Sequence, residues 1–310
     1  MNHANNGRTR HRLAPIGVLI AAAALSIGDR CRADDVRDAT QAAPIVQGQR
    51  IFTCGHSFHV FVYGLLDELA KSAGIADQEM VGISRIGGSR VVQHWDVPDE
   101  KNEAKRALTA GKVDVLTLSP IWLPDAGIEN FAKLAVEHNP KVRVLVQEFW
   151  LPNDTYEPKY PLDTRKKVDH DATDLAALRK SNAAYCDDIE KHVRELNEEL
   201  GKDALLVVPV GEASIALREK IVAGQAPGLK VQWDLFRDTW GHAKTPLMAL
   251  SGYCHFAVIY RRSPVGLAVP AILKNDKTIA DADKEPLNRL LQEIAWETVR
   301  SHKLTGVSAR

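Results

Sequence analysis

The sequence predicts an α/β fold in which a mostly parallel sheet lies between two layers of helices, a three-layer α/β/α sandwich. Short apolar runs typical of strands alternate with patterns of helical spacing along most of the chain. Strands separated by helices form parallel βαβ units, whose helices cover both faces of the sheet. The chain has 310 residues, of which 45% are hydrophobic, so it can bury a sizeable core in one large or two small domains.

The predicted strands and helices follow one another in chain order within a single body at residues 49–310. The first strand ends before Gly55, and later strands are expected at residues 81–86, 113–118, 142–149 and 203–210. Helices are expected at residues 60–73, 102–110, 128–138, 171–200, 212–223, 246–261 and 285–302. An insertion at about 151–200 departs from this rhythm, because it combines a proline-containing loop with one long, strongly charged helix.

Residues 1–33 are typical of a signal peptide. Three arginines precede an apolar stretch at residues 13–27, and Ala33 offers a cleavage site. The stretch is short for a membrane span, although an uncleaved N-terminal anchor is the alternative. We therefore expect a periplasmic or secreted protein with no stable membrane insertion after cleavage, in which residues 34–48 form a linker.

Charge and cysteine content argue against two classes of function, nucleic-acid binding and metal binding. The chain carries 40 basic and 40 acidic side chains, whereas a nucleic-acid-binding protein usually has a basic excess on one face. After removal of the signal peptide the cysteines are Cys54, Cys186 and Cys254, without the spacing of a metal site. We therefore expect no nucleic-acid partner, no metal and no cofactor.

The segment Gly55-His56-Ser57-Phe58 is the first candidate for chemistry, because it joins the first strand to the first helix. A Ser at the carboxyl end of this strand would stand in the crevice where α/β sheets bind ligands. The N-terminus of the following helix would supply free N–H groups and a positive dipole end, which favour an oxyanion. The alternative is that Ser57 only caps the helix.

Asp238 and His242 form the second candidate, shortly before the helix expected at residues 246–261. Together the two motifs resemble the first and last blocks of the SGNH (GDSL-like) hydrolases, over about residues 49–270. The resemblance implies a flavodoxin-like sandwich in which Ser57 is the nucleophile, His242 the general base and Asp238 the acid that orients His242. It also implies an oxyanion hole that includes a backbone N–H, for which Gly88 is preferred over Gly87.

Two departures from this family pattern concern the site itself. The family spaces its last block Asp-x-x-His, whereas Asp238 and His242 are separated by three residues, and Gly241 could absorb the extra one. The family also places an Asn oxyanion donor after a strand, whereas the strand at 113–118 is followed by Ser-Pro-Ile-Trp. Gln147 and Asn153, near the end of the next strand, are the candidate substitutes.

Three functions fit these observations. The leading one is an exported serine esterase acting on an ester. The resemblance implies an acyl group on a carbohydrate, because exported enzymes of this kind commonly meet such substrates. Several tryptophans near strand ends would also suit stacking on a sugar ring, with core and loop packing as the alternative. These are Trp95, Trp122, Trp150 and Trp240. The second is a catalytically inactive carbohydrate-binding or structural relative of the fold. The third is a lipase or thioesterase, although the polar loop at 151–167 gives no sign of the apolar lining that an acyl chain needs.

Overall fold

The computed structural model describes residues 43–156 and 167–307, all within a unit that spans residues 39–310. Five parallel strands form its sheet in the order β2-β1-β3-β4-β5. The strands are β1 (Arg50–Gly55), β2 (Glu79–Arg85), β3 (Val115–Leu118), β4 (Arg143–Gln147) and β5 (Leu205–Val208). The expected signal peptide, the linker up to residue 42 and the loop at 157–166 lie outside the described residues.

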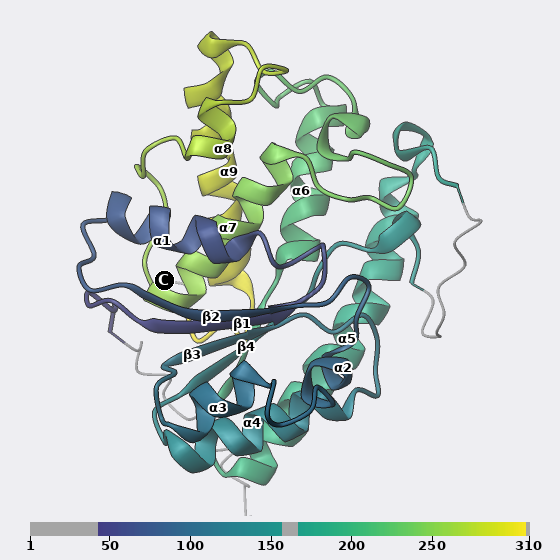
Figure 1. The fold of residues 1–310 in the computed structure, drawn as a ribbon. Helices are drawn as coiled ribbons and strands as arrows, with labels where there is room; N and C mark the ends of the chain where they lie inside the picture. The colour runs from purple at the N-terminus through teal and green to yellow at the C-terminus, as the bar shows by residue number, and fades with distance from the viewer. Residues whose placement is uncertain (1–42, 157–166, 308–310) are drawn as a thin grey trace, which may run out of the picture. The chain divides into compact units, whose positions relative to one another are not determined.

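Helices cover both faces of the sheet, which confirms the predicted three-layer sandwich (Figure 1). One layer holds α1 (Val62–Ser72), α6 (Val210–Val222), α7 (Thr245–Tyr260), α8 (Ala271–Lys274) and α9 (Asp281–Ser301). The other layer holds α2 (Val91–Trp95), α3 (Glu103–Thr109), α4 (Ala126–His138) and α5 (Leu175–Leu200). Single 3-10 turns form at η1 (Pro152–Asp154), η2 (His170–Ala172) and η3 (Gln232–Leu235).

The burial of the helices follows from their sequences. In α1 the buried side chains recur at three- and four-residue spacing, as in a helix with one face against a core. Helix α7 is apolar all round, and it is buried along almost its whole length because it packs between α1 and α9. Each strand from β3 to β5 is buried at every position, as expected of a parallel sheet covered on both faces.

The strand order creates a crevice at the carboxyl ends of the strands, beside β1. The chain moves from β1 outward to β2, and then returns to place β3 on the other side of β1. Ligands of open α/β sheets bind outside the carboxyl ends of the strands at such a switch point. Ser57 follows β1 and Ser119 follows β3, so both lie at this edge.

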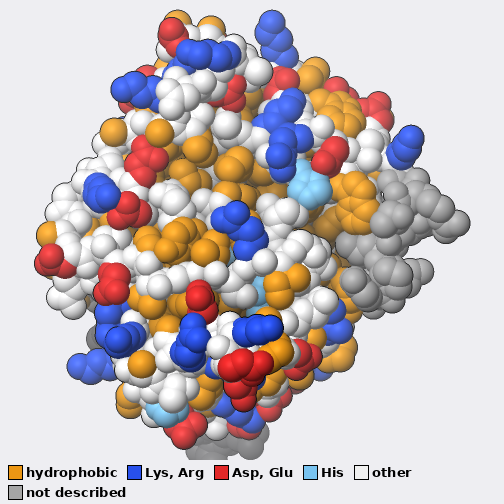
Figure 2. Space-filling model, viewed as in Figure 1, with side chains coloured by type: hydrophobic (Ala, Val, Ile, Leu, Met, Phe, Trp, Pro, Cys, Tyr) orange, Lys and Arg blue, Asp and Glu red, His pale blue; other side chains and the backbone are white. Residues whose placement is uncertain are grey.

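On the face shown in Figure 2, acidic and basic side chains are interspersed, and neither sign dominates a region. None of the helices within residues 43–156 and 167–307 combines the length and apolar character that a membrane span needs.

Candidate functional site

Ser57, His242 and Asp238 meet at the carboxyl edge of the sheet, joined by two short hydrogen bonds. Ser57 Oγ lies 2.9 Å from His242 Nε2, and His242 Nδ1 lies 2.7 Å from Asp238 Oδ2. Ser57 stands in the turn between β1 and α1, whereas the other two residues stand in the turn that precedes α7. The fold therefore unites side chains that are 185 positions apart in the sequence.

The turn from Asp238 to His242 accommodates the additional residue between them. Asp238 Oδ1 accepts hydrogen bonds from the backbone N–H groups of Trp240, Gly241 and His242, at 3.1, 3.1 and 3.2 Å. Gly241 has a φ of 90°, a left-handed value that glycine adopts readily. The role expected of Gly241 therefore agrees with its backbone conformation.

The charge on Asp238 determines which nitrogen of His242 carries the proton. Partial burial acts to raise the pKa of Asp238, but hydrogen bonds from the backbone N–H and the imidazole of His242 outweigh it and lower this pKa. A carboxylate only accepts hydrogen bonds, so His242 Nδ1–H donates to it. The lone pair of His242 Nε2 then faces the Ser57 hydroxyl, as proton transfer from that hydroxyl requires.

Gly87 and Gly88 lie across the cavity from this pair, in the turn after β2. Gly88 has a φ of 62°, which favours glycine. The backbone N–H groups of Ser57 and Gly88 donate to no other residue of the described chain. They are thus available to a ligand oxygen.

A chain of hydrogen bonds that the sequence did not indicate holds the Gly87-Gly88 turn. The imidazole of His94, on α2, lies 2.7 Å from both Ser84 Oγ and Ser89 Oγ, and the Ser89 hydroxyl donates to the carbonyl of Ile86 at 2.9 Å. Because Ser89 uses its proton on Ile86, its Oγ accepts from His94 Nε2–H, and His94 Nδ1 accepts from Ser84. Burial lowers the pKa of His94 to about 4, which matches this neutral ring.

Gln147 does not take the part expected of it as an oxyanion donor. Its amide nitrogen donates to the Phe58 carbonyl at 3.1 Å and to Ser119 Oγ at 3.3 Å, so both of its N–H groups are engaged. Its oxygen lies 2.9 Å from His59 Nδ1. The side chain is fully buried beneath the cavity and does not line it.

Asn153, the other candidate donor, does not line the cavity either. Its backbone N–H donates to the carbonyl of Trp240 at 3.1 Å, and its φ of 51° belongs to the tight turn after Pro152. Pro152 lines the cavity, whereas Asn153 is buried outside it. The described site therefore offers backbone N–H groups as oxyanion donors, without an amide side chain.

The cavity beside Ser57 has a volume of about 380 Å³ and an apolar wall. Its side chains come from the turns after β1, β2, β3 and β4 and from the His242 turn: His56, Ser57, Phe58, Ile121, Phe149, Pro152, Trp240 and His242, with Gly87 and Gly88. No Asp, Glu, Lys or Arg is among them. The apolar lining comes from residues that are distant in the sequence, and of the loop at 151–167 only Pro152 contributes to it among the described residues.

The histidines that flank Ser57 are packed polar groups. His56 Nδ1 accepts from the Phe58 N–H at 3.2 Å, and burial lowers the pKa of His56 to about 3. His59 is fully buried, with its Nε2 2.9 Å from Thr117 Oγ1. Both rings are thus neutral supports beneath the nucleophile.

The four tryptophans that suggested a sugar platform do not gather at the site. Of Trp95, Trp122, Trp150 and Trp240, only the last lines the cavity. Trp150 is buried, stacks on Phe58 with centroids 4.9 Å apart, and donates to the Gly241 carbonyl at 2.7 Å. Trp95 packs edge-on against Phe131 in the helical layer.

Comparisons with known proteins add little to this geometry. No protein-family profile matches the chain, and no curated protein matches it. Among solved structures, the chain is similar to a DUF4886 family protein from Bacteroides uniformis, at 13% sequence identity and a TM-score of 0.48. That match covers 82% of this chain and 95% of the other.

Proposed function

We propose that this chain is a serine ester hydrolase in which Ser57 is the nucleophile, His242 the general base and Asp238 the acid that orients it. One observation carries the proposal, namely the unbroken chain from Ser57 Oγ through both nitrogens of His242 to Asp238, at 2.9 and 2.7 Å. This arrangement can turn a hydroxyl into a nucleophile on unrelated folds. The pattern of residues 1–33 supports the further proposal that the enzyme is exported.

Ser57 Oγ would attack the ester carbonyl while its proton passes to His242 Nε2. The carbonyl oxygen then carries negative charge, and the backbone N–H groups of Ser57 and Gly88 would donate to it. Collapse of this intermediate breaks the bond to the alcohol, which takes the proton from His242. A water molecule, deprotonated by His242, then attacks the acyl-enzyme, so that the acid is released and Ser57 is regenerated.

The cavity favours an apolar acyl group over an acyl group on a carbohydrate. Phe58, Ile121 and Phe149 form much of its wall, and His56 is neutral there because its pKa is lowered to about 3 by burial. An apolar chain would release water from these surfaces, with about 0.8 kcal/mol per buried methylene. Of the two esterase alternatives, the lipase or thioesterase type is thus the better match to the wall.

The test is hydrolysis of p-nitrophenyl acetate, butyrate and hexanoate by wild type, Ser57→Ala and His242→Ala. The exposed Ser263→Ala is the matched control. We expect wild type and the control to turn over all three esters, with kcat/KM rising with acyl length by up to about fourfold per methylene. Both site variants should fall to background.

Two other results would change the proposal. Folded wild type that neither hydrolyses these esters nor reacts with a fluorophosphonate would exclude the hydrolase and favour the inactive relative. If acetate were the best ester and acetylated sugars were cleaved faster still, the carbohydrate esterase would be correct. Acyl length thus separates the two types of hydrolase.

A further inference from the structure

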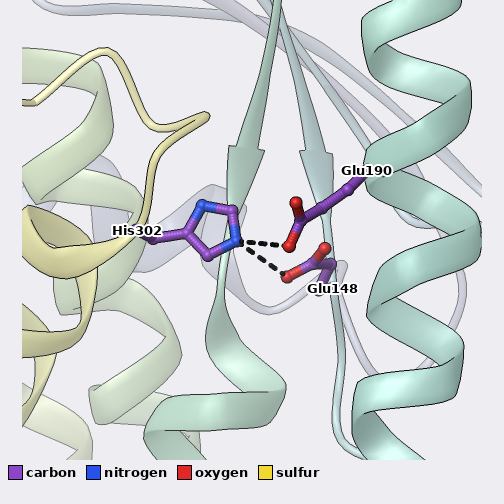
Figure 3. Close-up of side chains that lie close together, drawn as sticks. All are labelled: Glu148, Glu190 and His302. Carbon is purple, nitrogen blue, oxygen red and sulfur yellow. Dashed lines mark hydrogen bonds and ion pairs between the residues drawn. The ribbon is translucent and has the colours of Figure 1, made fainter.

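A second group of functional side chains lies apart from the Ser57 cavity. Glu148 follows β4, Glu190 lies on α5, and His302 follows α9 (Figure 3). His302 Nε2 is 3.2 Å from Glu190 Oε1 and 3.8 Å from Glu148 Oε2. The three side chains can each present one ligand atom within 4.8 Å of the other two. They line a cavity of about 190 Å³ that shares no residue with the cavity beside Ser57.

Glu148 is the unusual member of this group. Only 1% of the residue is exposed, and neither carboxylate oxygen has a hydrogen-bond partner among the described residues. His302 Nε2 approaches this carboxylate at 3.8 Å, which is longer than a hydrogen bond. A buried carboxylate without hydrogen bonds is costly, and such groups in proteins are normally paired or bound to a metal. The carboxylate faces a cavity whose wall also holds Asp187, Glu212, the Cys186 thiol and Arg179, whose charge is paired with Glu219 at 2.6 Å. Additional negative charge at this wall increases the attraction for a cation.

We propose that Glu148, Glu190 and His302 bind a divalent metal ion, of which Zn²⁺ best fits the set of one imidazole and two carboxylates. Ligands of tetrahedral Zn²⁺ at 2.0–2.1 Å are about 3.4 Å from one another, close to the 3.2 and 3.8 Å found around His302 Nε2. The Cys186 thiolate or a water molecule would complete the tetrahedron.

Metal binding would change one hydrogen bond of His302. The Leu304 N–H donates to His302 Nδ1 at 3.2 Å, which leaves the proton of the neutral ring on Nε2, directed at Glu190. A metal at Nε2 replaces that proton, and the ring then carries its proton on Nδ1. The Leu304 N–H, in a half-exposed turn, would donate to water instead.

The proposed metal would join three distant parts of the fold. Glu148 is fixed to the sheet, because its N–H donates to the Val208 carbonyl at 3.0 Å and its own carbonyl accepts from Gly211 at 2.7 Å. Glu190 is part of a helix in one layer, and His302 ends a helix of the other layer. A metal here would therefore connect β4, α5 and the end of α9, as structural zinc sites do.

The test uses the full chain, freed of metal with a chelator and titrated with Zn²⁺ in competition with a chromophoric chelator. The variants are Glu148→Gln, Glu190→Gln and His302→Gln, with His192→Gln on the same helix as the matched control. We expect wild type and the control to bind one more Zn²⁺ per chain than the variants do, or to bind it at least about tenfold more tightly. X-ray absorption should show nitrogen and oxygen ligands at about 2.0–2.1 Å.

Three results would overturn the proposal: no Zn²⁺ bound by wild type at 100-fold molar excess, equal binding by wild type and His302→Gln, or tighter binding of Ca²⁺ than of Zn²⁺. If Glu148→Gln does not fold, Glu190→Gln decides, because its side chain is 21% exposed and tolerates the change. Ser57→Ala should bind Zn²⁺ as wild type does, so the result is independent of hydrolysis.

Discussion

Replacing Asp238 with Asn tests the proposed role of this carboxylate while preserving the turn. In the native turn Oδ1 accepts three backbone N–H groups, and Oδ2 accepts from His242 Nδ1. In Asp238→Asn the amide oxygen keeps the position that faces the three donors, so the NH₂ group must face His242. His242 Nδ1 can then only accept, and its proton moves to Nε2. The ring would present a donor to Ser57 and could no longer act as its base.

The expected loss follows from this change of tautomer. In a Ser-His-Asp site the same substitution lowers kcat by about 10⁴. The side chains of Asp238 and His242 are 43% and 28% exposed, so water can restore part of the correct tautomer. We therefore expect kcat to fall by about 10³ to 10⁴, or about 4 to 5.5 kcal/mol of transition-state stabilisation.

The assay is steady-state hydrolysis of p-nitrophenyl butyrate, with the melting temperature measured alongside. Because the three backbone hydrogen bonds remain, the melting temperature should fall by no more than about 3 °C. Asp234→Asn is the matched control, since among the described residues this nearby carboxylate accepts only from the backbone of residues 230 and 231. If Asp238→Asn retains kcat within tenfold of wild type, Asp238 is not the orienting acid and the reasoning fails.

Four further predictions concern the supports of the site. In steady-state assays His94→Leu should lower kcat by about 10- to 100-fold with KM unchanged, because Ser89, next to Gly88, loses its hydrogen bond to His94. An equal rise in KM would contradict this prediction. Burial acts to raise the pKa of Asp154, but its bonds to His170 and Arg218 outweigh burial and lower it to about 2. Stability from this pair is thus complete above about pH 4 and is lost as pH falls towards 2, by about 2 kcal/mol in urea unfolding. Arg218→Met should cost about 3–5 kcal/mol at pH 7, because the buried carboxylate of Asp154 loses the guanidinium that holds both of its oxygens and keeps His170 and Thr173 as partners. A smaller loss would mean that these two partners compensate for the lost charge. Gly241→Ala has space for its Cβ, with the nearest side-chain atom 3.6 Å away, yet should cost about 1–3 kcal/mol in the same unfolding assay, because φ is 90°.

The layers of the fold could be predicted because hydrophobic periodicity is a local property. The helical spacing of apolar residues at 60–73, for example, predicts the helix that the structure shows as α1, with its buried side chains on one face. The apolar run of residues 246–261 predicts α7, whose even hydrophobicity reflects burial on all sides. The short helices α2 and α8 were not predicted, because four or five residues carry too little periodicity. Boundaries shifted for a similar reason, as in the last strand, which spans Leu205–Val208 rather than 203–210.

Of the candidate site, only the residues that belong to short sequence motifs could be predicted. Ser57 and His242 stand in turns next to recognisable elements, and the fold brings them within 2.9 Å. The hydrogen-bond partners of Gln147 could not be predicted, because they come from residues that lie 28 to 104 positions away. His94 was missed for the same reason, since an isolated His in a helical pattern gives no sign of its partners. Long-range contacts thus decide which amides and imidazoles remain free to act on a substrate.

The segment that breaks the α/β rhythm supports the turn of the proposed triad. Two hydrogen bonds from this segment and one from the residue just before it show this: the Asn153 N–H donates to the Trp240 carbonyl at 3.1 Å, His170 Nε2–H to the Asp238 carbonyl at 3.0 Å, and Trp150 Nε1–H to the Gly241 carbonyl at 2.7 Å. All three carbonyls belong to the turn whose N–H groups bind Asp238 Oδ1.

The same segment is itself fixed from the core. Arg218, on α6 and 2% exposed, holds both oxygens of Asp154 at 2.7 and 2.9 Å, and Asp154 Oδ2 lies 2.9 Å from His170 Nδ1. A buried ion pair of this kind adds little net stability compared with apolar packing, but breaking it is costly, so it holds its loop in one position. The described part of the insertion therefore supports the turn that holds Asp238 and His242. The position of His242 then depends on the ion pair of Arg218 and Asp154, neither of which lines the cavity beside Ser57.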